Sequence, residues 1–305
     1  MSKAEAKNIL VIGCRGQVGQ ELLARAPARG FAVSGMGLPE IDITNPASVS
    51  QAVEACSPDL LINAAAYTAV DKAENEPDLA RAVNTLGPKN LAHVAAEADI
   101  PLFHISTDYV FDGAKHLPYL EDDPIAPLGV YGVTKAEGDE AVSDALQKHI
   151  ILRTAWVYSP FGGNFVKTML RLSDTHDELR VVDDQHGCPT AASDIADALL
   201  TIAGSYFSAP TAMERRWGTY HFCNGPTTTW CGFAKAIIEG KTARGGRSVP
   251  VHAITTADYP TPARRPASSV LGCDKIEKAF GIKPRVWQDA LEETLDRLTA
   301  FSESM

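Results

Sequence analysis

Tyr131 and Lys135 lie four positions apart in the stretch Tyr-Gly-Val-Thr-Lys, a spacing that places both side chains on one face of a helix. A tyrosine has an ordinary pKa of about 10 and donates a proton poorly at neutral pH. A nearby ammonium group favours the phenolate, so Lys135 is expected to lower the pKa of Tyr131 and to make proton exchange with a carbonyl oxygen feasible. Taken alone, the pair is equally compatible with two exposed helical side chains.

A hydroxyl group that could assist this pair occurs in the triplet Ser-Thr-Asp at residues 106–108, at the end of an apolar stretch typical of a buried strand. Thr107 precedes Tyr131 by 24 residues. A hydroxyl, a phenol and an amine can together hold a ketone oxygen and protonate it. We therefore interpret Thr107, Tyr131 and Lys135 as a catalytic group.

A glycine-rich turn near the N-terminus indicates where a hydride could come from. It follows the first apolar stretch and opens the first helix, where glycines allow the backbone to approach a pyrophosphate and the helix N-terminus attracts the phosphates. The alternative is a simple strand-to-helix turn, but the placement favours nucleotide binding. The residues expected to bind the cofactor here are Gly13, Arg15, Gly16, Gln17, Val18 and Gly19.

The choice of cofactor should be visible after the second expected strand, which ends in Ser-Gly-Met-Gly at residues 34–37. This segment lacks the acidic residue that binds a ribose 2′-hydroxyl. Arg15 could approach a 2′-phosphate instead, or could be a solvent-exposed loop arginine. NADPH is therefore favoured and NADH stays possible. Asp42 and Ile43 could meet the adenine, and Asp42 could equally cap a helix.

Apolar patterning predicts the elements that must position these groups. Short apolar runs, typical of strands buried on both faces of a parallel sheet, cover residues 8–13, 31–35, 59–63, 101–106 and 149–152. Helical periodicity or composition covers residues 17–26, 80–98 and 133–146, with a further helix starting at Asn45-Pro46. The alternation predicts an α/β fold with a Rossmann-like, doubly wound parallel sheet, whose ligands bind at the carboxyl ends of the strands.

The alternation weakens after about residue 153, where prolines and loops become more frequent. We therefore expect a dinucleotide-binding domain over residues 1–153, joined by part of residues 179–222. Residues 154–305 should form most of a smaller, partly interleaved C-terminal α/β domain for the substrate. Residues 287–301 have the apolar spacing of a closing amphipathic helix.

Composition limits the possible partners and compartment. The net charge of −10 disfavours binding to nucleic acid. The sequence has no run of about 18 apolar residues, so no membrane span is predicted. Residues 1–7 lack the pattern of a signal peptide. The six cysteines include no Cys-x-x-Cys pair, so reduced thiols, no cysteine metal site and a cytoplasmic location are expected.

The chain resembles the extended short-chain dehydrogenase/reductases, and among them the family of dTDP-4-dehydrorhamnose reductases. The resemblance covers almost the whole length. Its more specific motifs are Ala-Val-Asp-Lys-Ala-Glu, Arg-Thr-Ala-Trp-Val-Tyr and Tyr-Pro-Thr-Pro-Ala-Arg-Arg-Pro. They accompany the glycine-rich turn and the segments at residues 63–68, 106–111, 131–135, 164–169 and 184–190.

The resemblance implies a reaction: an NAD(P)H-dependent reduction of the C4 ketone of dTDP-4-dehydro-β-L-rhamnose to dTDP-β-L-rhamnose, the last step of dTDP-L-rhamnose biosynthesis. Tyr131 would donate the proton, with Lys135 as its partner and Thr107 on the carbonyl oxygen. The small residues Ala64, Ala65 and Ala66, which could also serve tight packing, would line the cofactor, as Asp42 and Ile43 would line the adenine. The implied substrate residues are Asp108, Trp156, Val70, Asp71, Asn164 and Arg265.

Several alternatives stay open. Another sugar-nucleotide epimerase or reductase of the superfamily is one, and a non-catalytic regulatory subunit resembling that of methionine adenosyltransferase is another. Ala267-Ser268 departs from the family's usual small residue followed by asparagine. The resemblance raises magnesium and a homodimer as possibilities, but the sequence contains no ligand cluster that could be named.

Overall fold

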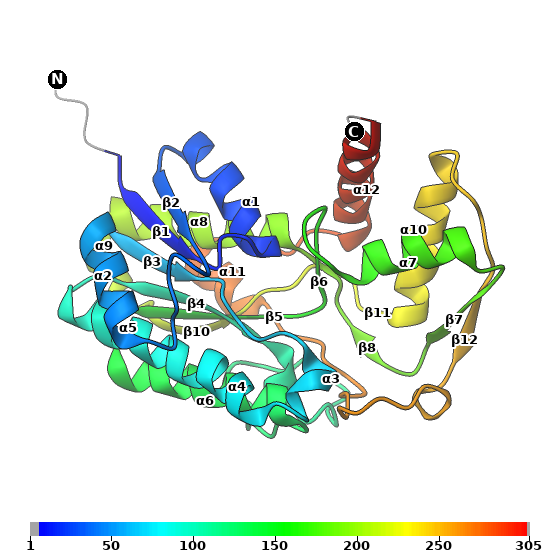
Figure 1. Ribbon diagram of the computed structural model, residues 1–305, viewed down its shortest axis with the longest axis horizontal. Helices are drawn as coiled ribbons and strands as arrows, with labels where there is room; N and C mark the ends of the chain where they lie inside the picture. The colour runs from blue at the N-terminus through cyan, green and yellow to red at the C-terminus, as the bar shows by residue number, and fades with distance from the viewer. Residues whose placement is uncertain (1–5, 304–305) are drawn as a thin grey trace.

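A computed structural model describes residues 6–303, so the expectation for the first residues of the chain lies largely outside the described part. Its centre is a parallel sheet of six strands in the order β10-β5-β4-β3-β1-β2 (Figure 1). The strands are β1 (Asn8–Ile12), β2 (Ala32–Met36), β3 (Leu60–Asn63), β4 (Leu102–Thr107), β5 (His149–Thr154) and β10 (Gly218–His221). The prediction of a doubly wound α/β fold is confirmed.

Helices cover both faces of this sheet because its strands are apolar on both sides. In β1, Ile9 and Val11 pack on one face in the same cluster as residues of α1 and α8, whereas Leu10 and Ile12 pack on the other face with residues of α2 and α5. The helices that cover the two faces of the sheet are α1 (Gln17–Arg25), α2 (Pro46–Cys56), α5 (Gly87–Glu97), α6 (Val130–Ala145) and α8 (Ala192–Ser208). As predicted, Asn45 caps α2 just before Pro46.

The single helix predicted over residues 80–98 is wrong. The chain forms α4 (Pro77–Arg81), a π-helical turn (Ala82–Leu86) and then α5. Pro88, which cannot donate to an i−4 carbonyl, stands in the first turn of α5. The wider turn places the buried Asn84 side chain against Tyr67, whose N–H it accepts at 2.8 Å and whose carbonyl it contacts at 3.1 Å. Such π-turns are frequent near functional sites.

A smaller lobe follows β5 and is seen at the right of Figure 1. Its own apolar core includes Tyr158, Phe233 and Trp287. Its helices are α7 (Phe165–Thr175), α10 (Trp230–Ala243) and α12 (Trp287–Glu303). Its short strands pair as β6 (Val157–Tyr158) with β9 (Thr190–Ala191), β7 (Leu179–Val182) with β12 (Val251–Ile254), and β8 (His186–Gly187) with β11 (Thr228–Thr229).

The chain between these lobe segments returns to the large sheet. Helix α8 packs on α1, where Arg25 and Arg29 both pair with Asp197 at 2.8 and 2.7 Å. Strand β10 then extends the sheet beside β5, and α11 (Asp274–Phe280) lies near it, after α9 (Pro210–Met213). The domain limits of 153 and 179–222 stay a prediction. The remaining short helix, α3 (Val70–Ala73), lies beside α6 (Figure 1).

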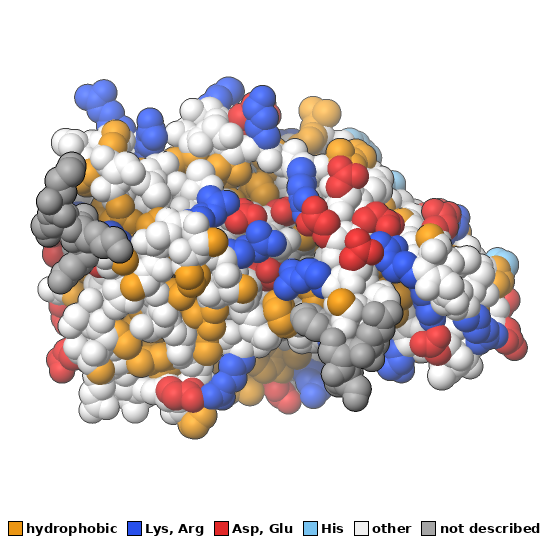
Figure 2. Space-filling view, turned by 90° about the horizontal axis from the view of Figure 1, so that it is seen from above, with side chains coloured by type: hydrophobic (Ala, Val, Ile, Leu, Met, Phe, Trp, Pro, Cys, Tyr) orange, Lys and Arg blue, Asp and Glu red, His pale blue; other side chains and the backbone are white. Residues whose placement is uncertain are grey.

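Charges on the surface are mixed in sign. On the face shown in Figure 2, lysines and arginines lie among aspartates and glutamates. Arg297 of α12, for example, pairs with Glu21 of α1 at 2.6 Å. Among the described helices, none has the length and apolar character needed to cross a membrane.

Candidate active site

The carboxyl ends of β1, β3 and β4 meet at one rim of the sheet, where parallel α/β proteins bind ligands. A cavity of about 570 Å³ opens there between the sheet and the smaller lobe. Most of the residues predicted from sequence line it: Gly16, Gln17, Val18, Ala64, Ala66, Val70, Thr107, Asp108, Tyr131, Lys135, Trp156 and Asn164. Gly13, Arg15, Gly19, Asp42, Ile43, Ala65, Asp71 and Arg265 are not among the lining residues.

The glycine-rich turn is so tight that it leaves no room for a side chain at Gly13 or Gly19. Gly13 has a φ of +80°, and a Cβ atom there would lie 2.6 Å from the Ala65 nitrogen. A Cβ atom on Gly19 would lie 2.3 Å from the Gly13 carbonyl oxygen. Gly16 precedes α1, and no side chain caps this helix. Its first N–H groups are therefore free to bind phosphate oxygens at the cavity wall.

Arg15 and Asp42 already have partners near the end of β2. Arg15 donates to the Leu38 carbonyl and pairs with Glu40 at 2.5 Å. Asp42 accepts the N–H and the hydroxyl of Thr44 at 2.9 and 2.8 Å. Glu40 lies three residues beyond the segment 34–37, which itself contains no acidic residue. Asp42 therefore makes a local turn and does not cap α2, because the cap of that helix is Asn45. Its contact with the adenine stays a prediction.

The end of β4 and the start of α6 form the centre of the cavity wall. Helix α6 begins at Val130, three residues earlier than predicted, so Tyr131 lies in its first turn. Glu74 accepts the Val130 N–H at 2.9 Å and so stabilises this helix start. Thr107 ends β4, accepts the Tyr109 N–H at 3.2 Å and donates to Asp108 at 2.9 Å.

The pKa of Tyr131 differs in direction from the expectation. Burial raises it to about 12, against the lowering effect of a hydrogen bond with Thr107. Lys135 is itself buried, and desolvation lowers its pKa to about 8 while Asp139 opposes that shift. Its amino group donates to the Ile105 carbonyl at 2.8 Å. Tyr131 is therefore protonated at neutral pH, which is the state that a proton donor needs.

Aromatic side chains form the wall of the cavity on the side of the smaller lobe. Trp156 stacks on Trp230 with ring centroids 3.5 Å apart and an angle of 8° between the planes. Phe165 lies 4.7 Å from Trp230. Trp156 has a φ of +46°, a left-handed conformation that is strained for a bulky residue. Trp230 was not found from sequence because it lies outside the recognised motifs.

Gln17 connects the glycine-rich turn to the smaller lobe. The side-chain amide oxygen of Gln17 accepts a hydrogen bond from the Asn164 amide nitrogen at 2.9 Å and another from the Ser159 hydroxyl at 3.1 Å. Asn164 also caps α7 by accepting the Lys167 N–H at 3.1 Å. Its side chain thus holds the two walls of the cavity together, in addition to facing the space between them.

Asp71 and Arg265 form an ion pair of 2.8 Å between α3 and the proline-rich loop. Asp71 also accepts the Ala263 N–H at 3.2 Å, so it holds this loop at two points. A diphosphate that binds Arg265 would compete with Asp71 for the same guanidinium group. The sequence predicted Asp71 and Arg265 as two separate substrate contacts. The structure brings these two side chains together as an ion pair.

Asp108 is buried, and desolvation raises its pKa to about 6, against hydrogen bonds from Ser269 and Thr107. A raised pKa means that the folded state holds the proton more tightly than the unfolded state does. Ionisation of the Asp108 carboxyl therefore destabilises the fold. This effect is absent at a pH below the pKa of the unfolded state and complete at a pH above the pKa of the folded state.

We therefore expect Asp108→Asn to stabilise the fold at pH 7.5 by up to about 3 kcal/mol, and to have little effect at pH 4, since the wild-type carboxyl is then neutral too. Urea unfolding at both pH values measures this difference. An equal effect at both values would show that the charge of Asp108 is not the cause.

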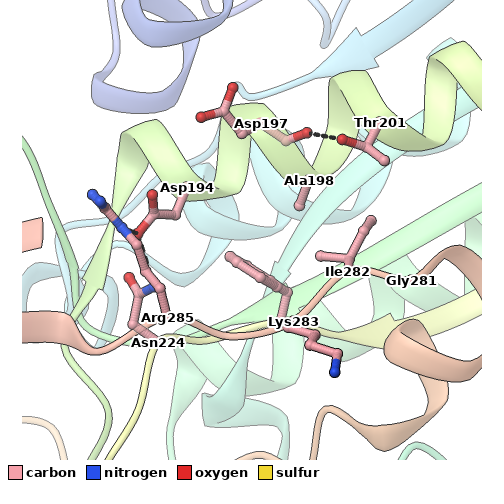
Figure 3. Close-up of a pocket in the computed structure, with 10 residues that line it drawn as sticks. Asp194, Asp197, Ala198, Thr201, Asn224, Gly281, Ile282, Lys283 and Arg285 are labelled. Atoms are coloured by element: carbon pink, nitrogen blue, oxygen red, sulfur yellow. Dashed lines mark hydrogen bonds and ion pairs between the residues drawn. The ribbon is translucent and has the colours of Figure 1, made fainter.

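A second, smaller cavity of about 210 Å³ lies between α8 and residues 281–285 (Figure 3). Its charged side chains already have partners, because Asp194 pairs with Arg285 and because Asp197 and Lys283 pair with residues outside the cavity. Asp194 accepts from Asn224 and from Arg285, both at 2.8 Å, and Arg285 also pairs with Glu293 at 2.7 Å. These contacts give the cavity a structural role at the junction of the two lobes.

Within residues 6–303, no three His, Cys, Asp or Glu side chains are grouped so that they could hold a metal ion. Glu40, Asn84 and Trp230 are among the residues near the site that the sequence did not indicate. Each acts through a contact to a residue distant in sequence, and single-sequence patterns carry no signal for such contacts.

The doubly wound sheet, the glycine-rich turn and the group Thr107, Tyr131 and Lys135 define an extended short-chain dehydrogenase/reductase. The family model described as "RmlD substrate binding domain" matches residues 7–300. A dTDP-4-dehydrorhamnose reductase of Sinorhizobium fredii is 47% identical over 282 residues, covering 92% of this chain and 94% of that relative. The chain belongs to the dTDP-4-dehydrorhamnose reductase family.

Solved structures agree with this assignment. A dTDP-4-dehydrorhamnose reductase from Clostridium acetobutylicum superposes with a TM-score of 0.89 at 39% identity, covering 96% of this chain and 99% of that one. A Bacillus anthracis dTDP-4-dehydrorhamnose reductase in complex with NADP superposes with a TM-score of 0.88 at 32% identity, with the same coverage.

Proposed function

We propose that this protein reduces the C4 ketone of dTDP-4-dehydro-β-L-rhamnose to give dTDP-β-L-rhamnose, with NADPH as the preferred cofactor. The observation that carries the proposal is the gathering of Thr107, Tyr131 and Lys135 on one cavity wall, next to the glycine-rich turn. Family membership over nearly the whole chain supports the substrate class.

The chain's own residues account for the proton in this reaction. Bound NADPH would supply the hydride that forms the new C4–H bond. The Tyr131 phenol, kept protonated by burial, donates its proton to the ketone oxygen and is later reprotonated from solvent. The Thr107 hydroxyl, now directed at Asp108, turns to the same oxygen and stabilises its developing negative charge. The Lys135 amino group lies behind them, on the Ile105 carbonyl.

The cavity has the features that a dinucleotide needs. Helix α1 presents the uncapped N–H groups of its first turn, just after Gly16, to the phosphates, and the small Ala64 and Ala66 leave space along the sheet edge. The buried hydroxyls of Ser106 and Thr154 face this cavity and have no hydrogen-bond partner among the described residues. Polar groups of a bound ligand would satisfy them. NADPH is preferred here because Arg15 stands at the end of β2 and because a family member was solved with NADP.

Glu40 should weaken the preference for NADPH, because it neutralises Arg15 and would repel a 2′-phosphate. Glu40→Gln is expected to lower the KM for NADPH by up to about fivefold, in line with an exposed ion pair, and to leave the KM for NADH nearly unchanged. Steady-state kinetics with both cofactors tests this. Arg15→Ala serves as the opposite control and should raise the KM for NADPH only.

The sugar and diphosphate have complementary surfaces in the smaller lobe. Trp156 lines the cavity while stacked on Trp230, and the apolar surface that it presents there suits a deoxysugar. Arg265 offers a bidentate fork to a phosphate once Asp71 releases it. Asn164 on this side and Val70, at the start of α3 beside α6, also line the cavity.

A coupled assay tests the proposed reaction. dTDP-glucose is converted to the 4-keto-L-sugar, this protein is added with NADPH or NADH, and the product is identified by NMR. dTDP-L-rhamnose supports the proposal. The C4 epimer, or a protein that retains tightly bound NAD and consumes no reduced cofactor, would favour the other reductase or epimerase. Absence of oxidation of NADPH with any dTDP-4-keto sugar would favour a regulatory subunit. Magnesium dependence, a homodimer and a cytoplasmic location stay predictions.

A further inference from the structure

Behind the catalytic wall, three buried side chains from different elements form a continuous polar chain. Asn63 ends β3, His104 lies in the middle of β4, and Lys135 lies on α6. The Asn63 amide nitrogen is 3.0 Å from His104 Nδ1, and His104 Nε2 is 3.2 Å from Lys135 Nζ. Asn63 and His104 have no solvent-exposed surface, so none of their polar atoms can exchange these contacts for water.

The orientation of Asn63 is determined by the backbone. Its Oδ1 accepts the Ala65 N–H at 3.0 Å, so the opposite end of the amide, the NH₂ group, must face His104. An NH₂ group is only a donor, and His104 Nδ1 must therefore be an acceptor. Complete burial lowers the pKa of His104 well below its ordinary value and keeps the ring neutral, whatever the charge of Lys135. A neutral imidazole that accepts at Nδ1 carries its proton on Nε2.

This tautomer directs an N–H group at Lys135. An ammonium group can only donate hydrogen bonds, so a protonated Lys135 would place its own N–H groups against the N–H of His104. A neutral amine has a lone pair and could accept the His104 N–H. Lys135 would still donate to the Ile105 carbonyl at 2.8 Å. All three side chains are satisfied together only when Lys135 is neutral.

The charged groups around Lys135 limit the size of this effect. Asp139 of α6 lies 3.9 Å from His104 Nε2 and favours the ammonium form, but it is paired with Arg153 of β5 at 3.0 Å. His149 of β5 has a pKa lowered by burial and adds no charge at neutral pH. Tyr131, on the cavity side, stays protonated and neutral at neutral pH because burial raises its pKa. Asp139 is therefore the one group of these that opposes the His104 contact.

We propose that Asn63 and His104 are positioning residues that set the protonation state of Lys135: Asn63 selects the His104 tautomer, and His104 presents its Nε2–H to the lysine, which favours the neutral amine. The inference deepens the proposed function, since it concerns the same catalytic lysine. It predicts that Lys135 exchanges protons near neutral pH, where the proton of Tyr131 is consumed and restored.

The tautomer can be measured in the wild-type protein without substrate. Protonated and unprotonated imidazole nitrogens have well-separated ¹⁵N chemical shifts, so ¹⁵N-histidine labelling with a His104→Gln sample for assignment identifies the ring. A proton on Nε2 is expected. A proton on Nδ1 would overturn the proposal, and this outcome does not depend on which sugar the enzyme reduces.

Asn63→Asp is designed to reverse the tautomer with almost no change in shape. A carboxylate can accept both the Ala65 N–H and a proton on His104 Nδ1, which leaves Nε2 as an acceptor for the ammonium. The alkaline limb of the kcat/KM profile, or the Lys135 pKa followed by NMR of labelled lysine, should move up by roughly 1 pH unit or more.

A second pair of variants separates the tautomer from the added negative charge. The shift caused by Asn63→Asp is measured again in a His104→Phe background. A shift that disappears without the imidazole supports the proposal. A shift of equal size in both backgrounds would show that the carboxylate acts by charge alone and would overturn it. If a variant does not fold, the wild-type tautomer still decides.

Discussion

Tyr131→Phe is expected to lower kcat by about 10²–10⁴-fold while the dissociation constant for NADPH changes little. The phenol is the group on the cavity wall whose proton is both available and correctly placed, since burial raises its pKa to about 12. Phenylalanine keeps the ring and its edge-on contact with Tyr109, at 5.5 Å between centroids. The loss should therefore be chemical and not structural.

Single-turnover rates and a fluorescence titration with NADPH measure the two quantities separately. Tyr206→Phe is a matched control, because this tyrosine lies on α8 and packs against Phe207 and Trp217, outside the cavity. It should keep the wild-type rate. Retention of near wild-type kcat by the Tyr131 variant would refute the assignment of the proton donor.

Thr107→Val is expected to lower kcat by about 10²–10³-fold, the usual effect of removing one donor from a developing oxyanion. Valine has nearly the shape of threonine, so the cavity wall should persist. The variant also loses two hydrogen bonds of the Thr107 hydroxyl, the one that it donates to Asp108 and the one that it accepts from the Tyr109 N–H. A stability loss of about 1–3 kcal/mol is expected from these buried groups.

Thr107→Ser separates the two effects because it restores the hydroxyl but removes the methyl group. It should recover most of the rate. Kinetics are measured at a temperature where unfolding curves show each variant fully folded. A valine variant with wild-type kcat would show that Tyr131 alone handles the ketone oxygen.

The candidate catalytic residues and the glycine-rich turn could be proposed from sequence because their chemistry depends on short-range spacing. Tyr131 and Lys135 need one helical turn between them, and the glycine-rich turn needs residues without side chains at Gly13 and Gly19, where a Cβ atom would collide with backbone. Buried parallel strands likewise leave continuous apolar runs. Residues far from these patterns, such as Trp230, contribute through contacts that no local pattern records.

Two expectations failed because tertiary packing overrides local tendency. The alanine-rich stretch after residue 80 has the composition of one helix, yet it contains a π-helical turn that places Asn84 on Tyr67. The pKa of Tyr131 was expected to fall beside an ammonium group, whereas desolvation raises it. Charge proximity can be inferred from sequence spacing, but the degree of burial cannot.

The sequence by itself determined the fold class, the family and the identity of the group Thr107, Tyr131 and Lys135, because periodicity and short motifs are local properties of the chain. Only the tertiary structure decided which charges are already neutralised, as in the pairs of Arg15 with Glu40 and Arg265 with Asp71, and how far burial shifts the pKa of Tyr131 and Lys135. Desolvation and ion pairing depend on distances between residues that are remote in sequence, and folding alone establishes those distances.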